Sequence, residues 1–388
     1  MQSIPRRWFG VGQSRVPDSA KAGAEAAAEA IGGRTPAAVF VFCSVAHDLP
    51  ALLAAVRAES GPDAAIVGST TAGELGSAGA SDGGVAIAAL GGEGFVVQTR
   101  VAHIDPHHPR DAGSTAAAAM HGMHADHQVL ILFCDGLAGR PHEIIRGAYT
   151  AVGATIPLVG GFGGDDRRFA KTFQFCDDEV LTDSVVGVAL GSDGPIGIGV
   201  AHGWSRIEPP MVVTRSHGAH IYQLDDQPAL DVLLRRNDFH GTAAEFFSRR
   251  LQLQPLGLAR RSGEDIRVIH AGDEDERSVW GTADVPQGAM VWPMEADRQA
   301  LLDGASWSCA EAVARLDGLA PLGVIAFDCG GRRAGLTESD GMLDDEIATI
   351  RTALNDAPFA GFYTHGEIAR VRGSLGMHHL TLVTLALA

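Results

Sequence analysis

The chain alternates short apolar segments with longer segments in which apolar residues recur at helical spacing. Continuously apolar segments of this length are typical of strands buried on both faces of a sheet. Three of them end on a cysteine: AAVFVFC at 37–43, QVLILFC at 128–134 and GVIAFDC at 323–329. A helical pattern follows each one, in HDLPALLAAVRAES, RPHEIIRGAYTAVG and DDEIATIRTALND. The same order of elements therefore occurs three times along the chain.

Each helical pattern is followed by a strand that ends in a glycine-rich turn. The first turn is GSTTAGE at 68–74, the second GGFGGDD at 160–166 and the third GFYTHGE at 361–367. The first and third turns match at four pairs of residues, Gly68/Gly361, Thr71/Thr364, Gly73/Gly366 and Glu74/Glu367. The middle turn carries Asp166 where the others carry glutamate. These matches indicate related structural units.

Closing strands complete the units. The segments GGVAIAAL and GFVVQTRVAH close the first, SVVGVALGS and PIGIGVAHGW the second, and HHLTLVTLALA the third. Between the second and third units, EDIRVIHAG, SVWGTADV and AMVWPMEA have the pattern of antiparallel strands. We predict an α/β protein of two domains built from repeated β-α-β-β-type units, with mixed sheets flanked by helices. The boundary is placed at Tyr222, giving domains over 1–221 and 222–388.

Composition and charge limit the partners and the cellular location to be expected. The 388 residues are 46% apolar, enough for sizeable cores, and their formal net charge is −17. This charge disfavours nucleic acids and anionic lipids as partners. There is no apolar run of membrane-spanning length and no secretory leader pattern. The five cysteines lack CxxC spacing and read as reduced thiols, so we expect a cytoplasmic protein.

Three phrases in this order carry a resemblance to a known family. They are GWSRIEPPMVVTRSHGAHIYQLDDQPALDVL at 203–233, FDCGGRR at 327–333 and GFYTHGEIA at 361–369. The chain resembles the FIST family of bacterial and eukaryotic signal-transduction sensory domains, with its N- and C-terminal parts, from about Ala37 to the end. The resemblance implies sensing of small molecules, amino acids among them, without chemistry on the ligand. FIST domains are often fused to output modules. Since the resemblance extends over nearly the whole chain, it implies a separate signalling protein as the partner.

The last turn is the main candidate for a ligand site. Glu367 follows one predicted strand and Arg332 another, so the two could converge at one edge of a sheet. Glu367 could then bind an ammonium group while Arg332 binds a carboxylate, as in amino-acid recognition. The structural alternative is that Glu367 caps its own turn and Arg332 pairs with it. Tyr363 and His365 are two residues apart and are expected to share a face.

Other residues of the repeated turns extend this candidate site. Thr364 belongs to the same turn, and Glu74 and Asp166 could line equivalent places in the other two units. Equally, these residues could all have one structural job. Since Tyr363 and His365 are the parts of GFYTHGE that do not recur in GSTTAGE, ligand specificity is expected to depend on them.

Two rival functions remain open at this point. Cys329, beside two glycines and Arg332 and with His365 elsewhere in the unit, could be the nucleophile of a hydrolase. Its counterparts Cys43 and Cys134 have no matching histidine, which favours a packing role for all three, and we predict no enzyme. The other rival is an interaction scaffold without a ligand.

Metal and phosphate sites receive little support. The histidines of HGMHADH are three residues apart, unlike the spacing of HExxH, and GGFGGDD lacks the Lys-Ser/Thr of a phosphate-binding loop. We therefore expect neither a metal nor another cofactor.

Overall fold

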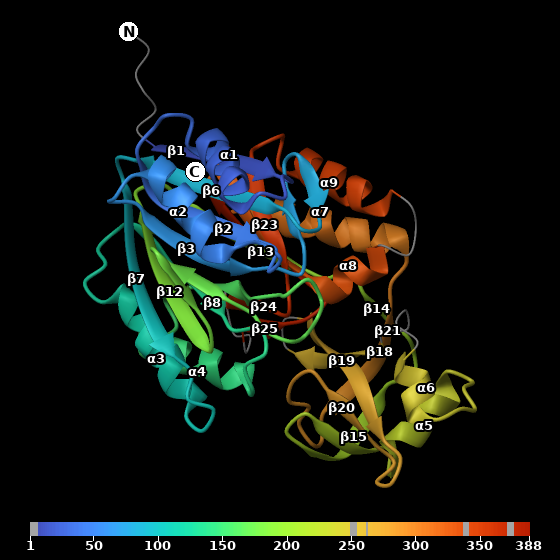
Figure 1. Ribbon diagram of the computed structural model, residues 1–388. Coiled ribbons are helices and arrows are strands. Elements are labelled where there is room, and N and C mark those ends of the chain that lie inside the picture. Colours follow the sequence, from blue (N-terminus) through green and yellow to red (C-terminus); the bar gives the residue numbers. More distant parts are fainter. Residues whose placement is uncertain (1–6, 249–253, 261–262, 337–340, 371–375) are drawn as a thin grey trace. The chain divides into compact units, whose positions relative to one another are not determined.

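The computed structural model describes residues 7–248, 254–260, 263–336, 341–370 and 376–388. Its chain forms two compact units, one made of residues 1–202 together with 302–388, the other of residues 203–301. Figure 1 shows both, coloured along the sequence. Among the described residues, no helix is long and apolar enough to cross a membrane.

Three consecutive modules make up the first unit, and each contains the same order of elements. The first comprises β1 (Arg7–Ser14), α1 (Ser19–Ile31), β2 (Pro36–Cys43), α2 (Leu49–Ser60), β3 (Ala65–Thr70), β4 (Glu74–Gly76), β5 (Gly79–Ser81) and β6 (Val85–Gly92). The second comprises β7 (Phe95–His103), α3 (Pro109–Ala117), the 3₁₀ turn η1 (Ala118–Met120), β8 (His127–Cys134), α4 (Pro141–Val152), β9 (Leu158–Phe162), β10 (Gln174–Cys176), β11 (Glu179–Leu181) and β12 (Ser184–Ser192). The third begins with β13 (Ile196–Ala201) and, after the second unit, continues with α7 (Arg298–Ala314), β22 (Gly323–Cys329), α8 (Gly330–Leu336), α9 (Met342–Ala353), β23 (Phe359–Thr364), β24 (Glu367–Arg370), β25 (Met377–His378) and β26 (Leu382–Leu387).

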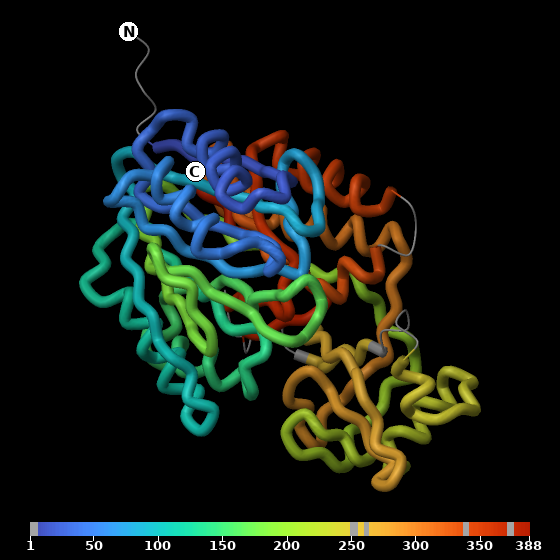
Figure 2. Tube along the Cα trace, in the orientation of Figure 1, coloured from blue at the N-terminus to red at the C-terminus, as the bar shows by residue number. Residues whose placement is uncertain are grey.

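The modules exchange hairpins in a cycle. The three six-stranded sheets have the orders β1-β6-β2-β3-β10-β11, β7-β12-β8-β9-β24-β25 and β13-β26-β22-β23-β4-β5. Each sheet thus takes four strands from one module and its last two from the next module, the third module receiving the hairpin of the first. In Figure 2 this brings the red C-terminal segment beside the blue N-terminal one, where β23 pairs with β4.

Each sheet is mixed, because one parallel pair lies among antiparallel neighbours. The parallel pairs are β2–β3, β8–β9 and β22–β23. Helices α1 and α2 pack against the first sheet through apolar residues such as Leu52 and Val56. The predicted α/β class with mixed sheets flanked by helices is confirmed.

Two details of the predicted repeat are wrong. The segment GFVVQTRVAH does not close the first unit, since it forms β7 and pairs with β12 of the second module. Likewise, PIGIGVAHGW supplies β13, which pairs with β26 of the third. A strand that follows a closing strand in sequence therefore opens the next module, and the hydrophobic pattern alone does not distinguish the two.

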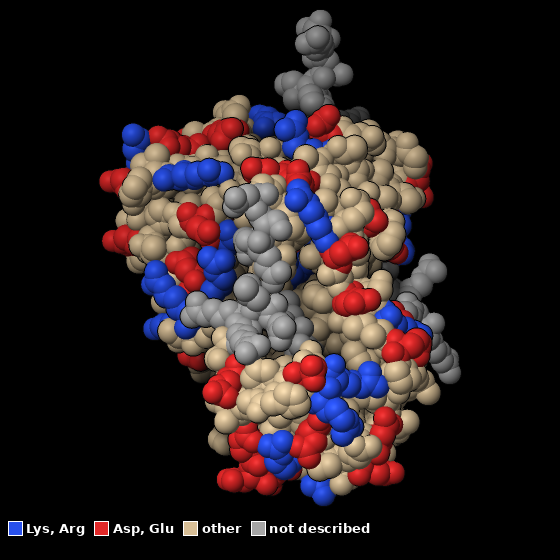
Figure 3. Space-filling view, turned by 90° about the vertical axis from the view of Figure 1, so that its right-hand side faces the viewer, with Lys and Arg blue, Asp and Glu red and all other residues tan. Residues whose placement is uncertain are grey.

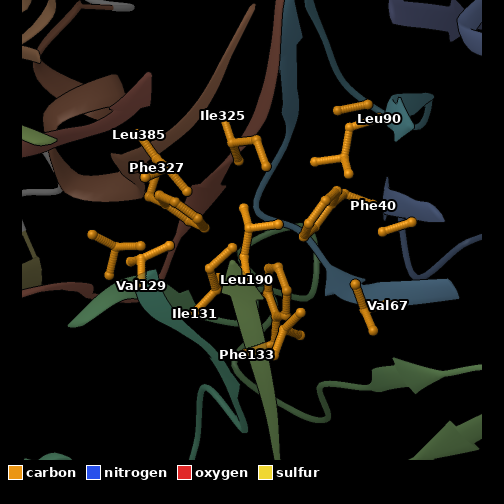
Figure 4. Packing of buried hydrophobic residues seen from close by; sticks show 14 of the residues in the cluster. Phe40, Val67, Leu90, Val129, Ile131, Phe133, Leu190, Ile325, Phe327 and Leu385 are labelled. Carbon is orange, nitrogen blue, oxygen red and sulfur yellow. The ribbon is translucent and has the colours of Figure 1, made fainter. Parts of the chain in front are cut away.

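The apolar faces of the three sheets share one core. Strand residues Phe42, Phe133 and Phe327 are fully buried there, and Phe362 stacks on Phe42 with ring centroids 4.9 Å apart. Figure 4 shows Phe133 and Phe327 among the aliphatic side chains of this core. Aromatic rings in such offset contacts stabilise a core beyond their buried area.

In its described residues, the second unit is a small closed barrel accompanied by short helices. Its elements are β14 (Ser205–Arg206), β15 (Met211–His217), β16 (His220–Leu224), β17 (Gln227–Pro228), α5 (Ala229–Arg236), α6 (Ala243–Ser248), β18 (Gln254–Arg260), β19 (Gly263–Asp273), β20 (Ser278–Gly281) and β21 (Met290–Glu295). Strand β21 pairs with both β15 and β18, which closes the ring β15-β16-β20-β19-β18-β21. The predicted boundary residue Tyr222 lies on β16, inside this unit. The division of the sequence into domains 1–221 and 222–388 stays a prediction.

Charged residues of both signs are interspersed over the described part of the face in Figure 3. They do not gather there into one large basic patch, in keeping with the acidic net charge of the chain.

We predict that Gly164→Ala destabilises the protein by about 3 kcal/mol, because overpacking against backbone cannot relax cheaply. A Cβ at Gly164 would lie 2.2 Å from the backbone nitrogen of Ala72, in the neighbouring module. Urea unfolding measures the free energy of unfolding. Gly139→Ala is the matched control, since a Cβ there meets nothing within 4 Å. Equal stability of the two variants would contradict the close approach of the two turns.

Candidate functional site

The three glycine-rich turns meet one another. The backbone N–H of Ala72 donates to Tyr363 (2.8 Å), that of Gly164 to Thr70 (2.9 Å) and that of His365 to Phe162 (3.0 Å). The acceptors Thr70, Phe162 and Tyr363 are equivalent residues of the three turns, and each donor lies two residues after the acceptor of its own turn. The three bonds therefore repeat one geometry around a cycle. We call residues 70–74, 162–166 and 363–367 the turn junction. Because the parallel strands of all three sheets end here, the junction is where a ligand of an α/β fold is expected.

In the first turn, Glu74 holds the backbone together. Its carboxylate accepts hydrogen bonds from the Thr71 hydroxyl (2.6 Å), the Ser81 hydroxyl (2.8 Å) and the Gly84 N–H (2.9 Å). The side chain is fully buried. Burial raises the pKa of Glu74 to about 7, although these hydrogen bonds act in the opposite direction.

Glu367 repeats this arrangement in the third turn. It accepts from the Thr364 hydroxyl (2.5 Å) and the Thr381 N–H (3.3 Å), and the Cys329 thiol also donates to it. It is fully buried, and burial raises its pKa to about 8. Both glutamates thus tie a turn to the start of the module's closing strand, which is the structural role left open by the sequence.

The middle turn is built differently. Here the N–H before the closing strand, that of Asp183, donates to Asp135 (3.1 Å) at the end of β8. Asp166, which aligns with the glutamates, instead accepts from the hydroxyl of Ser44 (2.8 Å) in the first module. Because Asp135 takes over the tie to the closing strand, the middle turn can have another sequence.

Arg332 lies in a fully buried charge network on the other side of β23. Its guanidinium donates to Asp328 (3.0 Å) and forms an ion pair with Glu346, which also accepts from the Tyr363 hydroxyl (3.1 Å). The facing carboxylates Asp328 and Glu346 raise the pKa of Arg332 against the effect of burial. Buried pairs of this kind are costly to break, because one partner is then left as an uncompensated charge. These contacts give Arg332 and Tyr363 a place in the core of the third module.

Tyr363 and His365 have different surroundings, contrary to the shared face expected of them. Strand β23 ends at Thr364, so the alternation of a strand does not extend to His365. The Tyr363 ring lies under the Arg333 guanidinium, whereas the His365 ring stacks on Phe169.

Cys329 does not occupy the place of Cys43 and Cys134. In the strand pairs, Cys43 lies opposite Thr70 and Cys134 opposite Phe162, but the equivalent Tyr363 is paired with Asp328. Cys329 is one residue further along. Burial and the nearby Glu367 raise its pKa well above the ordinary thiol value. A buried thiol that stays protonated at neutral pH is a poor nucleophile.

His365 differs from the other residues of the junction. Its side chain is 5% exposed, and neither ring nitrogen has a hydrogen-bond partner among the described residues. Burial lowers its pKa, against the effect of Asp165, whose Oδ1 lies 3.8 Å from Nε2. The corresponding residues in the other turns are Ala72 and Gly164. A buried imidazole without partners is costly, which makes it a candidate ligand contact.

Asp165 and Phe169 surround this imidazole and were not predicted from the sequence. Asp165 accepts hydrogen bonds from four consecutive backbone N–H groups, those of residues 168–171, at 2.5–3.0 Å. Phe169 stacks on His365 with ring centroids 4.6 Å apart and planes 14° from parallel. The position of Asp165 directly after two glycines was the sequence signal that could have indicated it. Nothing in the sequence pattern relates Phe169 to His365. Among the described residues, no group of three or more His, Cys, Asp or Glu side chains could hold a metal ion.

Comparison with known proteins identifies the family of the chain. The FIST N domain matches residues 37–227 and the FIST C domain residues 229–370. The chain belongs to the FIST family. FIST domains are sensory domains of signal transduction, so the resemblance found in the sequence is confirmed. The two matched parts meet inside the second compact unit.

One relative matches almost the whole chain, and another matches about a third of it. The uncharacterized protein Rv0628c of Mycobacterium tuberculosis H37Rv is 30% identical over 389 residues, covering 96% of this chain and 97% of its own. The uncharacterized protein MJ1623 of Methanocaldococcus jannaschii is 35% identical over 154 residues, covering 37% of this chain and 30% of its own.

Two solved structures of cyanuric acid hydrolases are similar at 11% identity. One, described under "evolutionary innovation by structural concatenation", has a TM-score of 0.35 and covers 99% of this chain and 100% of its own. The other, from A. caulinodans, has a TM-score of 0.39 and covers 98% and 99%. Likeness at this level carries no argument about the function of this chain.

We predict that Glu74→Gln makes stability less dependent on pH. A carboxyl whose folded pKa is raised favours the folded state below its unfolded pKa of about 4.5, and this contribution is lost as pH rises through 7. The loss amounts to about 3 kcal/mol for wild type. Glutamine has nearly the shape of glutamate but does not titrate, and its amide N–H can donate to the Thr71 hydroxyl.

Urea unfolding of both proteins between pH 4.5 and 8 measures this difference. Glu59→Gln, on the surface end of α2, is the control for a change of net charge. Parallel pH profiles for wild type and Glu74→Gln would contradict a raised pKa at Glu74.

Proposed function

We propose that this protein senses a small molecule, with amino acids as the first class to test, and that the ligand binds at the turn junction in contact with His365. The observation that carries the proposal is the buried imidazole of His365, whose two nitrogens have no hydrogen-bond partner in the part of the chain that the structure describes. Membership of the sensory FIST family supports the same reading.

The proposed ligand contact differs from the contacts expected from the sequence. Thr364 and Cys329 both donate hydrogen bonds to Glu367. Arg332 is ion-paired to carboxylates of its own module. A ligand that recruited these groups would have to break buried contacts. His365 has no such bonds to lose, since its ring nitrogens are unpartnered among the described residues. A neutral imidazole offers one N–H donor and one acceptor to a ligand.

Signalling would follow from a shift in population. A ligand that binds one arrangement of the junction better than another favours that arrangement by its difference in affinity. Because the junction joins all three modules through backbone hydrogen bonds, its arrangement is communicated to each sheet. A separate signalling protein is proposed to recognise the favoured state.

Thermal unfolding in the presence of the twenty amino acids, one at a time, tests this proposal. An amino acid that binds should raise the free energy of unfolding by about 2.7 kcal/mol at a concentration of a hundred times its Kd. His365→Ala should abolish the shift, because it removes both nitrogens.

His240→Ala is the matched control, as its side chain is 91% exposed. It should respond to the amino acid as the wild type does. A flat response of the wild type to the whole panel would argue against amino-acid sensing, and an undiminished response of His365→Ala would remove His365 from the site.

A further inference from the structure

Phe169 is an unusual residue for its position. It is 67% exposed, the most exposed large hydrophobic side chain among the described residues, yet one face of its ring lies on the His365 imidazole. Most of this apolar ring therefore forgoes the free energy of burial, while the polar ring beneath it is 5% exposed. The apolar side chain therefore shields the polar one from water.

The backbone that presents Phe169 is held in a strained conformation. Asp166, Arg167 and Phe169 have φ angles of 55°, 64° and 53°, in the left-handed region that residues other than glycine rarely adopt. Such residues cost about 1 kcal/mol or more each and persist only where surrounding contacts impose them.

Asp165 supplies those contacts. Its two carboxylate oxygens accept the N–H groups of residues 168–171, so one side chain closes the whole loop. Carboxylates that accept several backbone N–H groups form strong, charge-assisted hydrogen bonds. The same carboxylate lies 3.8 Å from Nε2 of His365. Loop closure and the surroundings of the imidazole thus depend on one residue.

We propose that residues 165–171 form a gate over His365, with Phe169 as the side chain that an entering molecule displaces and Asp165 as the residue that holds the gate closed. This rests on the proposed function only in taking His365 as the ligand contact. A molecule that replaces Phe169 must restore the lost stacking as well as reach the ring nitrogens. Ligands with a flat face and a polar edge are accordingly favoured over aliphatic ones.

The gate can be tested without knowing the ligand. Diethyl pyrocarbonate acylates neutral imidazole nitrogens, and peptide mass mapping of the full-length protein follows His365 separately from the other histidines. In wild type the labelling of His365 should be slow, because reaction requires opening of the gate. Phe169→Ala should accelerate the labelling of His365 about tenfold, because the rate is proportional to the population of molecules in which the imidazole is exposed.

Two further variants make the result specific. Phe169→Tyr keeps the stacked ring and should retain slow labelling. Trp307→Ala removes another exposed aromatic side chain, 61% exposed on α7, and should leave the rate at His365 unchanged. Wild-type labelling of Phe169→Ala would overturn the gate. An equal acceleration in Trp307→Ala would also overturn it, since the effect would then be a general loosening of the fold.

Asp165→Asn tests what holds the gate closed. The amide group turns one acceptor oxygen into a donor that faces backbone N–H groups, so two of the four hydrogen bonds are lost. Hydrogen exchange should become faster at the amides of residues 168–171 and stay slow in β8 and β9, while His365 labelling rises. Unchanged exchange at 168–171 would overturn the role of Asp165.

These outcomes are separable from those of the ligand panel. If Phe169→Ala is labelled rapidly and no amino acid of the panel binds the wild type, the gate is supported and the amino-acid proposal is refuted. A binding response with gate variants that label like wild type would do the reverse.

Discussion

The cyclic exchange of hairpins is the constraint on which the rest of the structure depends. Strands β3, β9 and β23 each need a partner on their outer edge, because unpaired backbone groups are unfavourable when buried. In each case the hairpin of the next module supplies that partner. The modules therefore fold as one unit around a common core, and their three glycine-rich turns are brought to one place. The approach is close enough that Gly164 lies directly against the backbone of Ala72.

Buried carboxyl groups then fix the turns. In the first and third modules this is done by Glu74 and Glu367, each tied to the N–H that precedes the closing strand. In the second module Asp135 does the same from the end of β8. The transfer of this role matters, because it leaves the middle turn free to carry Asp165 and its loop. The candidate site thus owes its existence to the departure of one module from the common pattern.

The sequence predicted the architecture better than the site. Its apolar segments marked the strands, and the match between Glu74 and Glu367 marked equivalent turns, since both signals are local. The sequence pattern aligned Cys329 with Cys43 and Cys134, whereas the strand register aligns Asp328 with them. Hydrogen bonds across the sheet set this register, and the pattern does not show them. Arg332 was expected near Glu367, but its long side chain pairs with Asp328 and Glu346 in the core of its own module.

The sequence by itself determined the α/β class, the recurring units and the family of the chain, because these are recorded in residue patterns a few positions long. It also singled out His365 as a residue that does not recur in the matching turn. Only the tertiary structure decided that His365 lies beneath Phe169 and beside Asp165, about 200 residues away along the chain. The physical reason is that the hairpin of the third module completes the sheet of the second. No local pattern could bring these side chains together, because they meet only through pairing between modules.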